Sequence, residues 1–431
     1  MEQPDKTLIE QLRARGLIAQ ASAGEPLEVH LNKCIVAYCG FDPTAESLHI
    51  GHLVPLLVLR RFQMAGHKPI ALIGGATGMI GDPSFKDNER QLLSESQIFE
   101  WGEKIKDQIC RFVDFDGIEN RALVLNNLEW VKTLSALDFL RDVGKYFSVN
   151  NMISKESVKQ RIDREGSGIS FTEFAYSLLQ SYDFSELFRR YGCSVQIGGS
   201  DQWGNIVSGI NLCRRHHRAD CFGLTVPLIT RSDGKKFGKT ESGTIWLDAR
   251  KTSPYAFYQF WLNTSDDDVH QFLRIFTFIP LDEIESIVER DSNSLERPKG
   301  QKVLARELTR LVHGDDGFDA ARQITELLFT GQISALTEND FIQLLRDGMP
   351  SSPLGDASKP LTQSLVDCGL AHSGREVKDA LNRGAVFVNG EAKHTEDNLQ
   401  ASAIFASEKA FFAKYFLIRL GKKRYHLFYL A

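Results

Sequence analysis

Residues 34–75, CIVAYCGFDPTAESLHIGHLVPLLVLRRFQMAGHKPIALIGG, decide the fold class of this chain. Two short apolar runs, 34–39 and 69–75, lie on either side of a long apolar run over about 52–65, which ends before Gly66. A glycine there is typical of a helix C-terminus. Strands that start about 35 residues apart, with a helix between them, pair in parallel through a right-handed crossover. This stretch therefore predicts one βαβ unit.

Further apolar runs extend this unit into a larger sheet. Strands are predicted at 121–127, 193–199 and 222–229, and helical patterns occupy 131–147 and 170–191. Strands that alternate with helices predict an α/β fold with a doubly wound parallel sheet.

The composition changes several times along the rest of the chain. Residues 1–248 contain the predicted sheet, whereas helical periodicity dominates 249–347 and predicts a small all-helical domain. Residues 348–360, GMPSSPLGDASKP, have three prolines, two glycines and three serines, a composition typical of a linker. We expect a short αβ module over 361–431.

Length and composition are those of an ordinary globular protein. The chain has 431 residues, 42% hydrophobic and 25% charged, which predicts two or three domains. No apolar run is long enough to span a bilayer, and the N-terminus has no apolar signal segment, so we expect a cytoplasmic protein without a membrane partner. Seven cysteines without a CxxC pair indicate free thiols in a reducing compartment.

The charge is uneven along the chain. The net charge is -5, yet residues 401–431 hold six Lys or Arg against one Glu. A local basic patch of this kind indicates contact with RNA or DNA, and a solvated surface is the alternative.

Four polar loops follow predicted strands. They are YCGFDPTAESLHIGH at 38–52, GGATGMIGDPS at 74–84, IGGSDQWGN at 197–205 and RSDGKKFGKTESG at 231–243. Ligands of open α/β sheets bind at the carboxyl ends of the strands, so the four loops predict one site.

Two histidines stand at the predicted start of the helix in the first unit. Proline lacks an N–H group and is tolerated in a first turn, so Pro55 places the helix start near Gly51 or His52. The free N–H groups and the positive end of the helix dipole would then face the strand ends, and Gly51 would let a ligand approach the backbone. His49 and His52 add donors, so the segment predicts a phosphate site. Two histidines that only cap the helix are the alternative.

Lysines in the fourth loop indicate the same kind of ligand. Lys235, Lys236 and Lys239 lie in a polar, glycine-containing segment. Ammonium groups there suit a polyphosphate whose charge grows in a transition state, and a solvated loop is the alternative.

Other nucleotide and metal motifs fit poorly. GKKFGKT lacks the spacing of a P-loop, and GGATGMIG lacks the spacing of a dinucleotide fingerprint. Cys213, His216, His217 and Cys221 superficially resemble zinc ligands, but their spacing does not match known finger patterns.

HIGH at 49–52 and KFGKT at 236–240 resemble the two signatures of class I aminoacyl-tRNA synthetases. The stretches YCGFDPTAESLHIGH, GGATGMIGDPS, FAYSLLQSYDF, QIGGSDQWGN and TVPLITRSDGKKFGKTE are similar to those of the bacterial-type tyrosyl-tRNA synthetases. The tail, LVDCGLAHSGREVKDALNRGAVFVNG, resembles the S4 RNA-binding module of that family. The resemblance implies a Rossmann-like catalytic domain over 1–248, an anticodon-side helical domain over 249–347 and an S4-like RNA-binding domain over 361–431.

The resemblance also implies the activity. A tyrosine–tRNA ligase activates tyrosine with ATP to tyrosyl-adenylate and pyrophosphate, then transfers the tyrosyl group to the 3' end of tRNA(Tyr). ATP is a substrate, Mg²⁺ arrives with it because Mg²⁺ prefers phosphate oxygens and water, and no tightly bound metal is expected. A homodimer is implied as well.

The family's site residues map onto the loops of this sequence. Those implied for tyrosine binding are Tyr38, Asp82, Tyr176, Gln180, Asp183, Gln196 and Gln202. Those implied for ATP binding are Gly40, Asp42, His49, Gly51, His52, Gly199, Asp201 and Lys239. Those implied for catalysis around the phosphates are Thr44, His49, His52, Lys86, Arg90, Lys236 and Lys239. The doubled lysine leaves the role of Lys235 open.

The chemistry is consistent with these residue types. The carboxylate of an amino acid is already a nucleophile, so the reaction needs positioning and charge stabilisation but no general base. Two alternatives stay open. A tryptophan-specific relative conflicts with Tyr38 and Asp183, because indole offers only a donor. It also conflicts with the S4-like tail, which the tryptophan enzymes lack. An RNA-binding protein without catalysis conflicts with the intact signatures.

Overall fold

The computed structural model divides into two compact units, Met1–Asp248 with Ser265–Gly300 (unit 1) and Ala249–Thr264 with Gln301–Ala431 (unit 2). It describes residues 7–22, 24–84, 93–116, 119–155, 158–159, 162, 169–230, 232, 237–240, 243–293, 299–355 and 359–430, with the backbone alone at 24, 25, 239 and 240.

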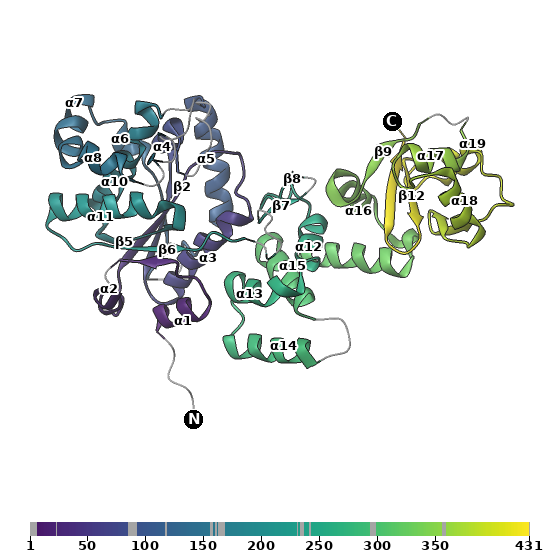
Figure 1. The fold of residues 1–431 in the computed structure, drawn as a ribbon, viewed down its shortest axis with the longest axis horizontal. Coiled ribbons are helices and arrows are strands. Elements are labelled where there is room, and N and C mark those ends of the chain that lie inside the picture. Colours follow the sequence, from purple (N-terminus) through teal and green to yellow (C-terminus); the bar gives the residue numbers. More distant parts are fainter. Residues whose placement is uncertain are drawn as a thin grey trace. The chain divides into compact units, whose positions relative to one another are not determined.

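A six-stranded sheet forms the centre of unit 1 (Figure 1). The order is β1-β6-β5-β2-β3-β4, in which β1 is antiparallel to β6 and all other neighbours are parallel. The strands are β1 (Gln20–Ala21), β2 (Val36–Phe41), β3 (Lys68–Ile73), β4 (Leu123–Asn126), β5 (Cys193–Gly199) and β6 (Phe222–Val226). The predicted doubly wound parallel sheet is confirmed, with β1 as an additional edge strand.

Helices cover both faces of this sheet. α3 (Ile50–Met64) and α5 (Glu95–Ile109) lie on one face, and α10 (Phe171–Tyr191) and α11 (Trp203–His217) lie on the other (Figure 1). The neighbouring strands β2 and β5 are followed by α3 and α11, so their connections leave toward opposite faces. Such a switch point opens a crevice at the carboxyl ends of the two strands.

α3 begins at Ile50, one residue before Gly51 and two before His52, the two positions near which its start was predicted. His49 is the N-cap, and Pro55 lies in the second turn, not in the first. There the proline removes the hydrogen bond that an amide would donate to the carbonyl of Gly51. Ten of the fifteen residues of α3 are buried, so tertiary packing holds the helix despite this loss.

The predicted helix over 131–147 is broken into short pieces. They are α6 (Leu128–Val131), α7 (Ala136–Asp138), a π-helix (Phe139–Val143) and a 3-10 turn (Gly144–Tyr146). The Ser135 hydroxyl accepts a hydrogen bond from the Asp138 N–H at 3.1 Å, so it caps α7 and starts a new helix inside the apolar pattern.

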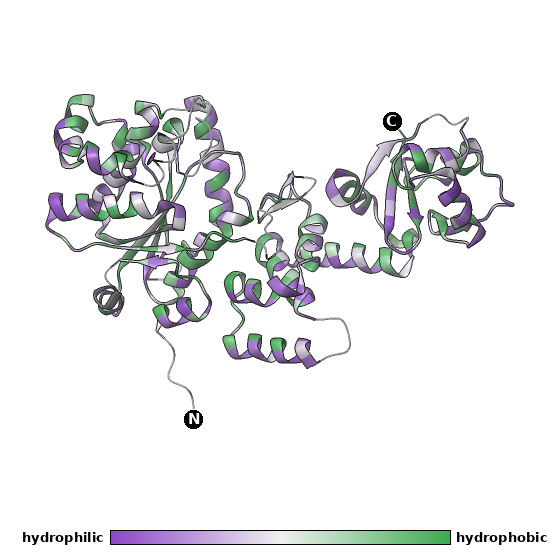
Figure 2. Ribbon diagram, in the orientation of Figure 1, coloured by the Kyte–Doolittle hydropathy of each residue, from purple (hydrophilic) through white to green (hydrophobic). Residues whose placement is uncertain are grey.

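Shorter elements complete unit 1. The helices are α1 (Leu8–Ala14), α2 (Gly24–His30), α4 (Gly75–Ile80), α8 (Val149–Ile153), α13 (Asp266–Phe276) and α14 (Leu281–Asn293), with a 3-10 turn at Ser200–Gln202. The strands β7 (Lys239–Thr240) and β8 (Gly243–Thr244) form a small antiparallel pair. α14 alternates hydrophobic and hydrophilic positions along its length (Figure 2).

Two buried arginines attach the C-terminal end of α13 to the α/β part of unit 1. Arg61 of α3 donates to the carbonyl of Thr277 at 2.6 Å. Arg15 donates to the same carbonyl at 3.1 Å and to the carbonyl of Ile279 at 2.7 Å. The negative end of a helix dipole favours cations at this place. These bonds help to group α13 and α14 with the sheet, whereas the sequence predicted 249–347 as one separate domain.

Unit 2 combines helices with a five-stranded sheet in the order β11-β10-β12-β13-β9. Its strands are β9 (Ser351–Pro353), β10 (Val386–Val388), β11 (Glu391–Lys393), β12 (Tyr415–Leu420) and β13 (Arg424–Tyr429). Its α-helices are α12 (Pro254–Leu262), α15 (Gly300–Thr330, kinked at Gly314), α16 (Glu338–Gln343), α17 (Leu361–Asp367), α18 (Gly374–Asn382) and α19 (Ala401–Ile404). Short 3-10 or π segments lie at Ile333–Ala335, Leu344–Gly348 and Ser407–Lys409.

One strand of this sheet lies where the sequence predicted a linker. β9 pairs in parallel with β13, so part of the proline-rich segment 348–360 belongs to the C-terminal sheet. Pro353 is tolerated because β9 is an edge strand, where one side of the backbone makes no ladder bonds. In the part of the chain that the structure describes, no helix has both the length and the apolar character needed to cross a membrane.

We predict that Arg61→Met lowers the free energy of unfolding of unit 1 by about 1.5–3 kcal/mol, because the Thr277 carbonyl loses a charged donor in a buried place. Urea denaturation followed by circular dichroism measures the change. Arg13→Met is the control: its ion pair with Glu28 is exposed, so the expected change is within about 0.5 kcal/mol. Equal effects of the two substitutions would contradict the prediction.

Candidate active site

A pocket of about 530 Å³ opens at the carboxyl ends of the central strands of unit 1. All predicted site residues whose side chains the structure describes, together with three predicted glycines, line this one pocket: Tyr38, Gly40, Asp42, Thr44, His49, Gly51, His52, Asp82, Tyr176, Gln180, Asp183, Gln196, Gly199, Asp201 and Gln202. Lys86, Arg90 and Lys236 lie outside the described residues, and only the backbone of Lys239 is described, in β7. The roles of these four residues stay predictions.

A buried carboxylate lies at one end of the pocket. Asp183 on α10 accepts a hydrogen bond from Trp130 Nε1 at 2.7 Å and another from Asn127 Nδ2 at 3.0 Å. Burial raises the pKa of the Asp183 carboxyl to about 7, although the two donors act in the opposite direction. The group therefore changes its charge near neutral pH.

Tyr38 on β2 also lines the pocket that contains Asp183. Its side chain is 1% exposed, and its ring packs against Phe184 with centroids 5.3 Å apart. Burial, and then the Asp183 charge, hold the pKa of the Tyr38 hydroxyl well above its usual value, so the hydroxyl keeps its proton. Its oxygen has no hydrogen-bond partner among the described residues. An unpaired buried hydroxyl is costly, so it indicates a place for a polar ligand atom.

Asp42, directly after β2, is the centre of a hydrogen-bond network. Tyr176 Oη and Thr77 Oγ1 each donate to its carboxylate at 2.7 Å. Asn127 donates to Thr77 Oγ1 at 3.0 Å as well as to Asp183. One chain of hydrogen bonds therefore joins Asp42 and Asp183, which fixes both carboxylates in the pocket wall.

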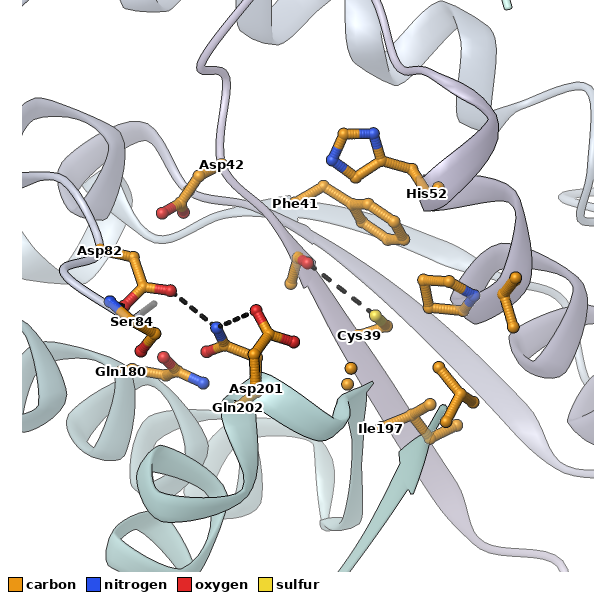
Figure 3. Close-up of a pocket in the computed structure, with 18 of the residues that line it drawn as sticks. Cys39, Phe41, Asp42, His52, Asp82, Ser84, Gln180, Ile197, Asp201 and Gln202 are labelled. Carbon is orange, nitrogen blue, oxygen red and sulfur yellow. Dashed lines mark hydrogen bonds between the residues drawn. The ribbon is translucent and has the colours of Figure 1, made fainter. Parts of the chain in front are cut away.

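Two further carboxylates surround the open part of the pocket. Figure 3 shows Asp42, Asp82 and Asp201 around the same space, with Gln202 between the last two. Gln202 Nε2 donates to Asp82 at 2.7 Å and to Asp201 at 3.3 Å, and the Ser84 N–H donates to Asp82 at 3.0 Å. Three acidic side chains around one cavity suit an ammonium group and hydroxyl donors.

His49 and His52 cap the start of α3. His49 Nδ1 accepts from the N–H of Gly51 at 3.0 Å, and His52 Nδ1 accepts from the N–H of His49 at 3.2 Å. The N–H of Ile50 is bonded to the carbonyl of Ile245. The expectation that free backbone N–H groups face a phosphate is therefore wrong for residues 50 and 51. With Nδ1 as the acceptor, each neutral ring has its proton on Nε2.

The sequence reasoning missed three residues that hold the predicted ones: Thr77, Asn127 and Trp130. Asn127 is the last residue of the strand predicted at 121–127, so the rule that ligand-site residues cluster at strand ends could have indicated it. Thr77 lies inside the quoted loop 74–84, but no pattern singled it out. No local signal distinguishes Trp130 from a core residue.

The residues weighed as zinc ligands have other partners. Ser185 Oγ lies 3.0 Å from His216 Nδ1 and 2.8 Å from His217 Nε2, and His216 Nε2 lies 2.9 Å from the Asp142 carbonyl. Among the described residues, no three His, Cys, Asp or Glu side chains are grouped as a metal site. The structure therefore gives the zinc alternative no support.

Comparisons with known proteins identify the family. The family model for class I tRNA synthetases of tryptophan and tyrosine matches residues 31–330, and the model for the C-terminal domain of tyrosine–tRNA ligases matches residues 340–428. The tyrosine–tRNA ligase of Aliivibrio fischeri strain MJ11 is 57% identical over 422 residues, 98% of each chain. That of Escherichia coli strain 55989 is 54% identical over 421 residues, 97% of this chain and 98% of the relative. The chain belongs to the tyrosine–tRNA ligases.

Solved structures agree with this family. A C-terminally truncated mitochondrial tyrosyl-tRNA synthetase of Aspergillus nidulans superposes with a TM-score of 0.68 at 33% identity, covering 75% of this chain and 94% of the other. A tryptophanyl-tRNA synthetase of Encephalitozoon cuniculi has a TM-score of 0.53 at 14% identity, covering 77% and 89%, and shows the shared fold alone. Three residues of the HIGH segment of this ligase, His49, Gly51 and His52, line the pocket described above.

We predict that Gly74→Ala destabilises the ligase by about 1–3 kcal/mol, because an added Cβ would clash with Asp42 Oδ1 and Thr77 Oγ1. Gly144→Ala is the matched control: its added Cβ would meet nothing closer than 3.7 Å, so the expected change is neutral or stabilising by up to about 1 kcal/mol. Urea denaturation of both variants gives the comparison. If both variants are as stable as the parent, Gly74 is not required by the Asp42 carboxylate.

Proposed function

We propose that this pocket activates tyrosine with ATP to form tyrosyl-adenylate and pyrophosphate, and then transfers the tyrosyl group to the 3' end of tRNA(Tyr). One observation is the main support: Tyr38 and Asp183 line the same pocket as the two histidines of the HIGH signature. This arrangement offers a place for a phenol and a place for phosphates within one cavity.

The phenol end is built from Tyr38 and Asp183. A phenol hydroxyl can donate its proton to the Asp183 carboxylate and accept from the Tyr38 hydroxyl at the same time. The bonds from Asn127 and Trp130 hold the carboxylate in position before the ligand arrives. Phenylalanine would leave the Tyr38 hydroxyl unpaired and would offer no donor to Asp183, which is the physical basis for its rejection.

The ammonium and carboxylate of the amino acid would occupy the middle of the pocket. Asp82, Tyr176 and Gln180 are assigned to the ammonium group, and Gln196 and Gln202 to the carboxylate end. Gln180 Oε1 is buried and has no hydrogen-bond partner among the described residues, so it can accept a hydrogen bond from the ammonium group. Gly199 and Asp201 are assigned to the ribose of ATP.

The phosphates would lie beside the start of α3. Attack of the tyrosine carboxylate on the α-phosphorus forms the carboxyl–phosphate bond and breaks the bond to pyrophosphate. Charge grows on the phosphate oxygens during this step, and His49 and His52 are assigned to donate hydrogen bonds to them. Thr44, Lys86, Arg90, Lys236 and Lys239 are assigned to the same charge. Mg²⁺ would arrive with ATP, because phosphate oxygens and water are its preferred ligands.

ATP–pyrophosphate exchange measured with each of the twenty amino acids tests the proposal. Exchange with tyrosine alone is expected. Exchange with tryptophan in place of tyrosine would indicate the other specificity of the family, and no exchange with any amino acid would indicate a protein that only binds RNA.

We predict that tyrosine binding weakens as the pH falls below about 7. The pKa of the free Asp183 carboxyl is about 7, and a neutral carboxyl is a much weaker acceptor for the phenol hydroxyl than a carboxylate. The Kd for tyrosine should rise by about 10-fold per pH unit below the midpoint and level off above it. Equilibrium dialysis with labelled tyrosine between pH 5.5 and 8.5 measures this.

Two variants give the control for this pH dependence. Trp130→Phe removes a donor that lowers the Asp183 pKa, so the midpoint should move to higher pH. Asp183→Asn should bind weakly and show no dependence on the pH in this range. A Kd of the parent protein that stays constant across the range would remove Asp183 from the phenol site.

A homodimer in the cytoplasm fits further features of the chain. Among the described residues, six exposed apolar side chains lie between α7 and the start of α10, namely Leu137, Leu140, Val149, Ile153, Ile162 and Phe171. Exposed apolar side chains that lie on one segment are typical of an interface, and we assign these side chains to contact with a second copy of the ligase. Sedimentation equilibrium with Leu137→Glu tests the assignment, because the variant should be monomeric. The seven free cysteines fit a reducing compartment.

We predict that removal of all residues after Pro350 separates the two half-reactions. The cut removes the whole five-stranded sheet, including β9, and with it the basic tail that carries Lys409, Lys414, Arg419, Lys422, Lys423 and Arg424. Pyrophosphate exchange should survive because the pocket lies in unit 1. Tyrosylation should fall steeply, and tRNA binding should lose part of its dependence on salt because fewer phosphates are neutralised.

The cut exposes one aromatic residue that needs a control. Phe341 on α16 packs against Phe411 and Tyr415, with ring centroids 5.3 and 5.1 Å away, and both partners are removed. The truncated variant should therefore also be made with Phe341→Gln to limit aggregation. Tyrosylation at the full-length rate would show that the tail is not the RNA-binding part.

A further inference from the structure

Helix α13 presents an aromatic pair to the KFGKT signature. Phe272 and Phe276 lie one turn apart on α13 and are 2% and 0% exposed. Phe237, the aromatic residue of the signature, packs against both: its centroid is 5.2 Å from that of Phe272 and 5.4 Å from that of Phe276, with the latter ring stacked at 21°. The side chain of Phe237 is therefore held by α13.

The other end of α13 binds the chain just before the signature. Asp268, 4% exposed, accepts a hydrogen bond from the N–H of Ser232 at 3.0 Å through Oδ1 and from the Ser265 hydroxyl at 2.7 Å through Oδ2. Residues 232 and 237 stand on either side of the doubled lysine in the sequence. One helix thus fixes the chain at two positions that flank this lysine pair.

The backbone after Phe237 is attached to the HIGH helix. The carbonyl of Gly238 accepts from the N–H of Ile245 at 3.0 Å, and the carbonyl of Ile245 accepts from the N–H of Ile50, the first residue of α3, at 3.1 Å. Gly238 has φ +78, and an added Cβ would lie 2.9 Å from Ile50 Cγ1, so only glycine fits this close approach. The two class I signatures are therefore connected through a single intervening residue.

We propose that Phe272 and Phe276 are positioning residues for adenylate formation, acting through Phe237 on the lysines of the KFGKT segment. The inference rests on the proposed role of Lys236 and Lys239 at the phosphates. A charged donor stabilises a transition state best when it is already in place, and a displacement of about 1 Å can cost about 10²-fold in rate. Phe237 lies two residues before Lys239, and its ring is held by α13, which neither lines the pocket nor contacts the phenol end.

The test is the single-turnover rate of adenylate formation at saturating tyrosine and ATP, measured together with the Kd for tyrosine. Phe272→Leu is expected to lower the rate by about 10- to 10²-fold while the tyrosine Kd stays within about two-fold. Ile275→Val, a fully buried substitution on the same helix, is the matched control and should change neither value. Circular dichroism confirms that each variant is folded.

A double-substitution cycle separates positioning from a general effect on the fold. If Phe272 acts through Phe237, the variant with Phe237→Leu and Phe272→Leu should be no slower than Phe237→Leu alone. Losses that multiply would overturn the inference, as would a Phe272→Leu variant in which the rate is unchanged or in which tyrosine binding weakens as much as the rate. Asp268→Asn keeps one acceptor oxygen, so its rate of adenylate formation should fall less than that of Asp268→Ala.

Lys239→Ala, measured in parallel, distinguishes the inference from the proposed function on which it rests. If Lys239→Ala forms adenylate slowly while Phe272→Leu forms it at the normal rate, only the positioning role of Phe272 and Phe276 is overturned. If Lys239→Ala forms adenylate at the normal rate, that lysine does not act at the phosphates. The positioning role proposed for Phe272 and Phe276 would then be overturned as well.

Discussion

The active-site pocket depends on a reversal in the winding of the sheet. β2 and β5 are neighbours, but the connection after β2 passes over one face and the connection after β5 passes over the other. The backbone therefore diverges at the carboxyl ends of these two strands, and side chains fill the space between the diverging segments. Asp42 after β2 and Asp201 after β5 face this space, while α3 and α10 supply the histidines and Asp183. Connections that left both strands toward the same face would not diverge in this way, so they would not open a crevice between them.

Buried charge is the cost of this arrangement, and the network around Asp42 and Asp183 reduces it. A carboxylate removed from water is stable only when donors replace the lost hydration. Tyr176 and Thr77 donate hydrogen bonds to Asp42, and Trp130 and Asn127 donate hydrogen bonds to Asp183. The pKa of Asp183 is nevertheless raised to about 7, so the donors compensate for only part of its burial. A ligand hydroxyl that donates a third hydrogen bond would complete the compensation, which couples the stability of the site to substrate binding.

Much of this could be predicted from the sequence because the decisive features are local. The strands carry continuous apolar runs, the polar loops follow them directly, and the parallel pairing brings the loops to one edge. Features that depend on tertiary contacts could not be predicted. α3 begins at Ile50 because two side chains cap it: the His49 ring accepts from the N–H of Gly51, and the His52 ring accepts from the N–H of His49. These bonds override the preference of Pro55 for a first turn. β9 forms inside a proline-rich segment because an exposed sheet edge was available to it, and no pattern within residues 348–360 indicates that edge.

Under the function proposed above, the preference for tyrosine is explained by the buried atoms that can still take a hydrogen-bond partner. Asp183 can accept one more hydrogen bond, and the Tyr38 hydroxyl has no partner among the described residues. An indole N–H could donate to Asp183, but it has no lone pair to accept from Tyr38, so one buried hydroxyl would stay unpaired at a cost of about 1–3 kcal/mol. A phenol hydroxyl satisfies both groups with one atom. Two proteins of the same fold can therefore differ in specificity through the donors and acceptors at the end of the pocket, while the signatures that handle the phosphates stay the same.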